Sequence, residues 1–158
     1  MKPDQTLTWM HDGTERLRRQ LAALPDEALD GPTELPGWNR RSLFSHIAAN
    51  ADALCNLLYW ARTGEERRMY ASAQARDAGI AAGALLPAAE LRARFDSAAA
   101  ALAAGFDAMT DEAWDAKVVT AQGMTRSASE IPWMRVRDRK STRLNSSHNQ
   151  RSRMPSSA

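Results

Sequence analysis

The sequence predicts an all-α protein of one domain, an up-and-down four-helix bundle with one short β-hairpin, and three observations support this. Apolar residues recur at three- and four-residue spacing along long stretches, as on the buried face of a helix. Pro- and Gly-containing segments separate these stretches. Only "KVVTAQGMTRSA" combines β-branched residues with a Gln-Gly turn. The length of 158 residues fits one such bundle.

The first two helices are each marked by an apolar stripe. A helix is expected over residues 6–24, followed by a segment rich in Pro and Gly. Asn39 is a suitable N-cap for a second helix, which should run to Thr63 and end at Gly64. The stripe residues are Leu7, Met10, Leu17, Leu21 and Leu24 in the first helix, and Leu43, Ile47, Leu54, Leu57, Leu58 and Ala61 in the second.

The second half of the bundle follows a connection that contains a short helix near residues 72–82. Pro87 should open a third long helix that runs to Met109, and Thr110 should cap one more turn. After the hairpin, Ser129 is expected to cap a fourth helix, with Pro132 tolerated in its first turn. This helix begins with "EIPWMRVR" and is expected to be cut short at residue 138.

Residues 138–158 differ from the rest of the chain. They contain five Lys or Arg residues and one Asp, a charge of +4, which leaves −2 for residues 1–137. Back-translated, "DRKSTRLNSSH" and "SRMPSSA" resemble the two ends of an adapter oligonucleotide used in short-read sequencing. We therefore expect residues 6–137 to be the native domain and 138–158 a non-native disordered tail.

Composition argues against several classes of protein. Without the basic tail the body has no positive stripe, so no nucleic-acid partner is expected. No apolar run reaches the roughly 20 residues of a membrane span, and no apolar leader follows Met1, so a cytoplasmic location and no membrane partner are expected. Cys55, the one cysteine, cannot form an internal disulfide and should be a core residue. The oligomeric state stays open.

His46 is the candidate functional residue. It lies three residues after Leu43 and one before Ile47, so its side chain should face the bundle interior, with Asn50 one turn further on the same face. It could be a core histidine bonded to a neighbour, or a metal ligand. One imidazole cannot hold a metal alone, because catalytic sites usually supply three protein ligands. His11 should be solvated, and His148 lies in the tail.

Three blocks in order resemble the N-terminal domain of mycothiol-dependent maleylpyruvate isomerases, which are DinB-like metal-binding bundles. The blocks are "LPGWNRRSLFSHIAANADALCNLLYWARTG", "MYASAQARDAGIAAGA" and "SASEIPWMRVR". The resemblance implies that His46 is the first metal ligand and that a Glu and a His, four residues apart, follow the last block. Asp138 and Thr142 occupy these two positions here, so the second and third ligands are not carried over.

The resemblance also implies an activity. Family members convert maleylpyruvate to fumarylpyruvate with two cofactors, mycothiol and a divalent metal that is usually zinc. The thiolate adds to the cis double bond, the resulting single bond rotates, and the thiol leaves to give the trans product. This chain is expected to be an inactive fragment of such an enzyme, with a small-molecule substrate and a low-molecular-weight thiol as its partners. The alternatives are a DinB-like thiol S-transferase of another substrate and a non-catalytic helical bundle.

Overall fold

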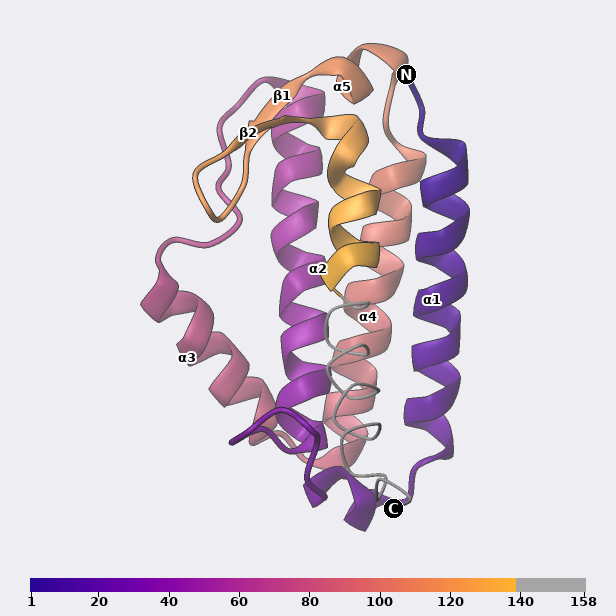
Figure 1. Cartoon of the computed structure of the whole chain (residues 1–158), viewed down its shortest axis with the longest axis vertical. Coiled ribbons are helices and arrows are strands. Elements are labelled where there is room, and N and C mark those ends of the chain that lie inside the picture. Colours follow the sequence, from indigo (N-terminus) through magenta and orange to yellow (C-terminus); the bar gives the residue numbers. More distant parts are fainter. Residues whose placement is uncertain (139–158) are drawn as a thin grey trace, which may run out of the picture.

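The computed structural model describes residues 1–138 and confirms the four-helix bundle (Figure 1). Its long helices are α1 (Asp4–Ala23), α2 (Arg40–Thr63) and α4 (Ala88–Asp107), and residues 131–138 form the start of another helix against them. A short 3-10 helix, η1 (Asp26–Asp30), lies between α1 and α2. Of the tail expected to be disordered, residues 139–158 lie outside the described part of the chain, and Asp138 is the last residue of the described helix.

The connection between α2 and α4 returns along the length of the bundle (Figure 1). It consists of an extended segment over residues 64–72 and of α3 (Ala73–Ala84), which is the short helix expected near residues 72–82. As a result α2 and α4 run in the same direction, whereas α1 and the 131–138 helix run the opposite way (Figure 1). The returning segment covers one side of α2, where the candidate site lies.

Three of the predicted helix ends are confirmed, whereas the first helix spans Asp4–Ala23 and not 6–24, and the third long helix ends at Asp107 and not at Met109. The Asn39 side chain accepts a hydrogen bond from the Ser42 backbone N–H at 2.9 Å and starts α2. Gly64 ends α2 in the left-handed conformation, with φ of 77°. Thr110 caps the short helix α5 (Asp111–Asp115) by accepting from the Ala113 N–H.

The predicted hairpin forms, but the predicted cap of the last helix is wrong. Strands β1 (Lys117–Val119) and β2 (Thr125–Ser127) pair antiparallel around Gly123, whose φ is 81°. Ser127, not Ser129, caps the chain that follows, through the 3-10 turn η2 (Ala128–Glu130). Its hydroxyl accepts from the Ser129 N–H while the Glu130 carboxylate accepts from the Ser127 N–H, and this reciprocal capping box fixes the start.

The core consists of two apolar clusters, one centred on α2, α4 and the hairpin end, the other at the opposite end of the bundle. Phe106 stacks on Trp114 in the first, with ring centroids 6.0 Å apart, and Phe44 meets Phe95 edge-on in the second at 5.8 Å. Cys55, expected in the core, is only partly buried at its edge. Within residues 1–138, no helix is long and apolar enough to cross a membrane.

Helix α3 packs closely on α2 through a serine and a glycine. The buried Ser45 hydroxyl donates to the Ile80 carbonyl at 2.7 Å. A Cβ on Gly83 would lie 2.2 Å from Ser45 Oγ, whereas a Cβ on Gly79 would meet nothing within 4 Å. The contact therefore needs glycine at position 83 and fixes α3 beside His46.

We expect Gly83→Ala to lower the free energy of unfolding by about 1–3 kcal/mol, because the new methyl group displaces the bonded Ser45 hydroxyl. Gly79→Ala, in the same helix, is the matched control and should be neutral or stabilising by up to about 1 kcal/mol. Urea denaturation of both variants measures the difference. Equal stabilisation by both substitutions would show that α3 does not pack on α2 in this way.

Candidate functional site

The imidazole of His46 points into the bundle, as the sequence predicts. The residue is 8% exposed and lies near the start of the buried face of α2. The Trp38 ring meets the imidazole edge-on, with ring centroids 5.4 Å apart. His11, in contrast, is exposed on α1, which confirms the prediction that it is solvated.

A carboxylate from the last described helix faces His46. The Asp138 carboxylate lies with its two oxygens 3.2 and 3.4 Å from His46 Nε2. The His46 side chain is 10% exposed and that of Asp138 is 31% exposed, so the pair is largely shielded from water. The structure thus brings the position that follows "WMRVR" directly against the first candidate ligand.

Arg135 holds the last helix so that Asp138 faces α2. Its side chain is almost fully buried, with 1% of the residue exposed. Its Nη1 donates to the Ile47 carbonyl at 2.6 Å and to Asn50 Oδ1 at 2.9 Å. Asp138 follows three residues later, on the same helix face. The helical spacing correctly predicts Asn50 on the His46 face, but it gives no sign of Arg135, which connects that face to the last helix.

Arg76 contacts the other nitrogen of the imidazole. It lies on α3, and its Nη2 is 3.4 Å from His46 Nδ1. A guanidinium group only donates hydrogen bonds, so Nδ1 acts as the acceptor in this contact. The ring proton of neutral His46 is then on Nε2, where it donates to Asp138.

The environment of Asp138 favours its ionised form. Burial alone would raise the pKa of this carboxyl group. The hydrogen bond from His46 and the positive charges of Arg135 and Arg76 outweigh burial and hold the pKa below its usual value. The site therefore places a carboxylate against His46, and carboxylate and imidazole are both ordinary zinc ligands.

Two adjoining cavities open beside this pair. The smaller, of about 220 Å³, is lined by Asp138, Arg137 and Asn50 among others. The larger, of about 590 Å³, lies between the 64–72 segment, the start of α3 and the hairpin turn. Met69, Thr120 and Gln122 line both cavities, so the two cavities adjoin, and the smaller one reaches Asp138.

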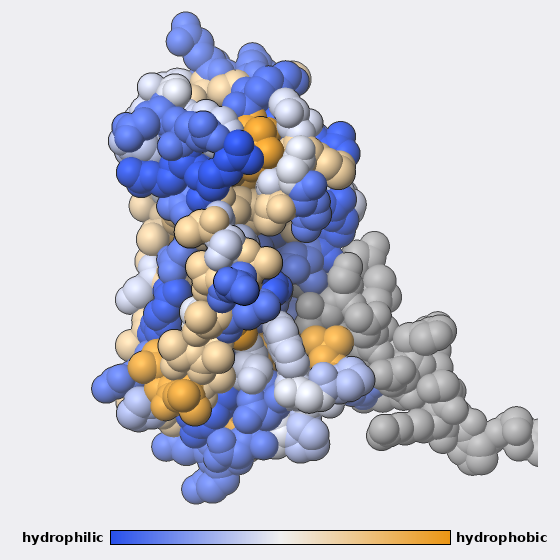
Figure 2. Space-filling model, turned by 90° about the vertical axis from the view of Figure 1, so that its left-hand side faces the viewer, coloured by the Kyte–Doolittle hydropathy of each residue, from blue (hydrophilic) through white to orange (hydrophobic). Residues whose placement is uncertain are grey.

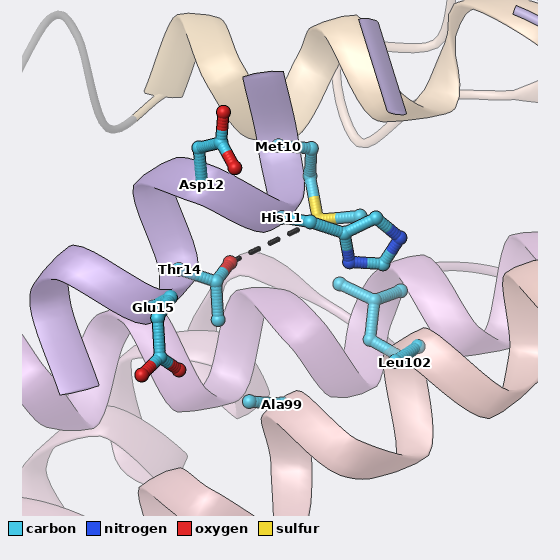
Figure 3. A pocket seen from close by; sticks show the side chains of 8 residues that line it. Met10, His11, Asp12, Thr14, Glu15, Ala99 and Leu102 are labelled. Atoms are coloured by element: carbon cyan, nitrogen blue, oxygen red, sulfur yellow. Dashed lines mark hydrogen bonds between the residues drawn. The ribbon is translucent and has the colours of Figure 1, made fainter. Parts of the chain in front are cut away.

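Another cavity, of about 330 Å³, lies between α1 and α4 (Figure 3). His11, Asp12 and Glu15 line it, but their side chains point in different directions (Figure 3). Two hydrogen-bonded arginines, Arg18 first and Arg19 second, lower the pKa of the half-buried Glu15 to about 2. The imidazole and the carboxylates that line this cavity therefore do not converge on one point.

The donors found beside His46 do not complete a zinc site. Among residues 1–138, no group of three or more His, Cys, Asp or Glu side chains could hold a metal ion. His46 and Asp138 supply two donors, and a stable site needs three or four. The position four residues after Asp138 is Thr142, a poor zinc ligand, and it lies beyond the described residues.

The arrangement of the helices is that of the DinB-like helical bundles. The family model of the mycothiol maleylpyruvate isomerase N-terminal domain matches residues 10–139. This match spans most of the chain, and the protein belongs to this family.

Two solved structures agree with this assignment. The crystal structure of the mycothiol-dependent maleylpyruvate isomerase is 38% identical, with a TM-score of 0.87. The crystal structure of a histidine-to-alanine mutant of that isomerase is 37% identical, also with a TM-score of 0.87. Each match covers 92% of this chain and 61% of the other, so the chain spans about three fifths of the length of these relatives. A comparison with curated proteins found no match.

Proposed function

We propose that residues 6–137 are the metal-binding domain of a mycothiol-dependent maleylpyruvate isomerase and that His46 is one of its metal ligands. The observation that carries this proposal is the 3.2 Å approach of His46 Nε2 to Asp138. It shows that the helix after "WMRVR" delivers its side chain to His46, as a second ligand at that position would require. The 38% identity to a solved isomerase supports the same substrate, maleylpyruvate, and the same thiol cofactor, mycothiol.

We also propose that residues 138–158 do not come from the same gene and that the chain as written is inactive. The adapter-like codons support this, as does the end of the family match at residue 139. In the complete enzyme, bound zinc would stabilise the thiolate form of the cofactor. Because this chain's donors do not complete the zinc site, we assign no catalytic step to it. The cytoplasmic location stays a prediction.

A chimera tests the proposal. Residues 1–137 are joined to the segment that follows the equivalent position in the solved isomerase, which restores the family's Glu, His and remaining length. We expect the chimera to convert maleylpyruvate to fumarylpyruvate when mycothiol and zinc are present, whereas the original chain does not. Proton NMR of the cis and trans vinyl signals measures the conversion.

Two variants of the chimera show whether His46 takes part. His46→Ala should abolish the conversion, because the site loses a ligand. His11→Ala removes an exposed imidazole on α1 and should leave the rate unchanged. A chimera that folds and binds zinc but does not isomerise maleylpyruvate would refute the proposal that maleylpyruvate is the substrate. Full activity of the His46→Ala variant would refute the proposal that His46 is a metal ligand.

A further inference from the structure

The wall of the 590 Å³ cavity carries two arginines and no carboxylate. Its polar lining consists of Arg68, Tyr70, Ser72, Arg76, Thr120 and Gln122. These residues come from three segments that are far apart in sequence: the 64–72 connection, the beginning of α3 and the hairpin turn. On the face that carries α3, hydrophilic residues predominate at the level of the hairpin (Figure 2).

The acidic partners of the two arginines lie outside this wall. Arg68 pairs with Glu66 at 2.8 Å and Arg76 pairs with Asp77 at 2.9 Å, but neither acid lines the cavity. The Glu66 and Asp77 side chains are 56% and 72% exposed, so water screens their charge. The charged groups on the cavity wall are therefore the two guanidinium groups, and the Asp138 carboxylate lines the adjoining smaller cavity.

The remaining lining groups suit a carboxylate. The Thr120 hydroxyl and the Gln122 amide can donate hydrogen bonds, as can the Tyr70 hydroxyl. Burial is the main cause of a raised Tyr70 pKa, so this phenol keeps its proton at neutral pH. A carboxylate with guanidinium and hydroxyl donors around it forms charge-assisted hydrogen bonds, which are stronger than neutral ones.

Arg76 joins this cavity to the imidazole–carboxylate pair. The same guanidinium that lines the cavity contacts His46 Nδ1, and the smaller cavity with Asp138 opens alongside. We propose that the larger cavity binds the carboxylate of a small-molecule ligand through Arg76 and Arg68, which orients the rest of that ligand toward His46. That this ligand is the isomerase substrate rests on the proposed function, but carboxylate binding does not.

Malonate tests the proposal on the full chain in the presence of a metal chelator and without mycothiol. We expect saturable amide shifts in ¹⁵N NMR spectra, confined to residues 68–76 and 120–123. The uncharged dimethyl malonate should cause none. Arg76→Gln and Arg68→Gln should each weaken malonate binding about tenfold, because each removes a charged donor. Arg94→Gln is the matched control: Arg94 lies on α4 with Asp52 as its partner, away from the cavity, and binding should not change.

Three results would overturn the proposal. The first is malonate shifts that lie elsewhere or do not saturate. The second is an unchanged affinity for malonate in both the Arg76→Gln and the Arg68→Gln variants. The third is inorganic phosphate saturating the same amides at lower concentration than malonate, which would assign the cavity to another anion. Because neither metal nor mycothiol is present in this experiment, none of these results depends on the proposed isomerase function.

Discussion

Replacing Asp138 by Glu and Thr142 by His raises the zinc affinity of the chain by about a hundredfold or more. His46 already lies 3.2 Å from the Asp138 carboxylate, so a glutamate there keeps the second donor in reach. Residues four apart in a helix lie on one face, so a histidine at position 142 is expected to add a third donor. Three protein ligands hold zinc firmly, whereas an imidazole and one carboxylate hold it weakly.

Zinc titration against a competing chelator measures this gain. Adding His46→Ala to the double variant should remove it, because the three ligands act as one site. Adding His11→Ala, the matched control, should leave it intact, since His11 is exposed on α1. If the original chain, the double variant and the His46→Ala triple variant bind zinc alike, His46 is only a core histidine and the metal proposal fails.

Arg135→Met lowers the free energy of unfolding by about 2–4 kcal/mol. The substitution keeps the apolar stem but removes the buried donor to the Ile47 carbonyl and to Asn50 Oδ1. Losing a hydrogen bond from a charged group costs about 1.5–3 kcal/mol, and the Asn50 oxygen is buried. For a chain of this size, Tm should fall by roughly 5–15 °C.

Arg137→Met is the control for this experiment. Arg137 is exposed on the same helix, so its substitution should change stability by less than about 0.5 kcal/mol. Urea denaturation followed by circular dichroism gives both values. Equal urea midpoints for the two variants would show that Arg135 does not anchor the last helix to α2.

Most of the fold was predictable because its signals are local. The apolar stripes set the long helices, and Asn39, Gly64 and Thr110 act on residues within one turn of themselves. A local signal could also have corrected the wrong prediction of a cap at Ser129. Ser127 and Glu130 stand in capping-box spacing, and that pattern marks the true start.

The site was predictable only in part, because its contacts join distant segments. The stripe placed His46 in the interior, and the family resemblance marked it as a ligand. No periodicity indicates that Arg76, on another helix, reaches His46 Nδ1. Arg135 was missed for a related reason: a charged residue within a helix is normally expected at the surface, and its buried acceptors lie on α2.

The 92-residue separation between His46 and Asp138 has a consequence for how the protein unfolds. An ion that binds residues of both helices acts as a cross-link across this long loop, much as a disulfide does. Closing a loop of this length restricts the unfolded chain, and for a disulfide the effect is roughly 4–5 kcal/mol. Removing an ion bound to both helices would therefore lower the free energy of unfolding, and resistance to proteolysis would depend on metal content.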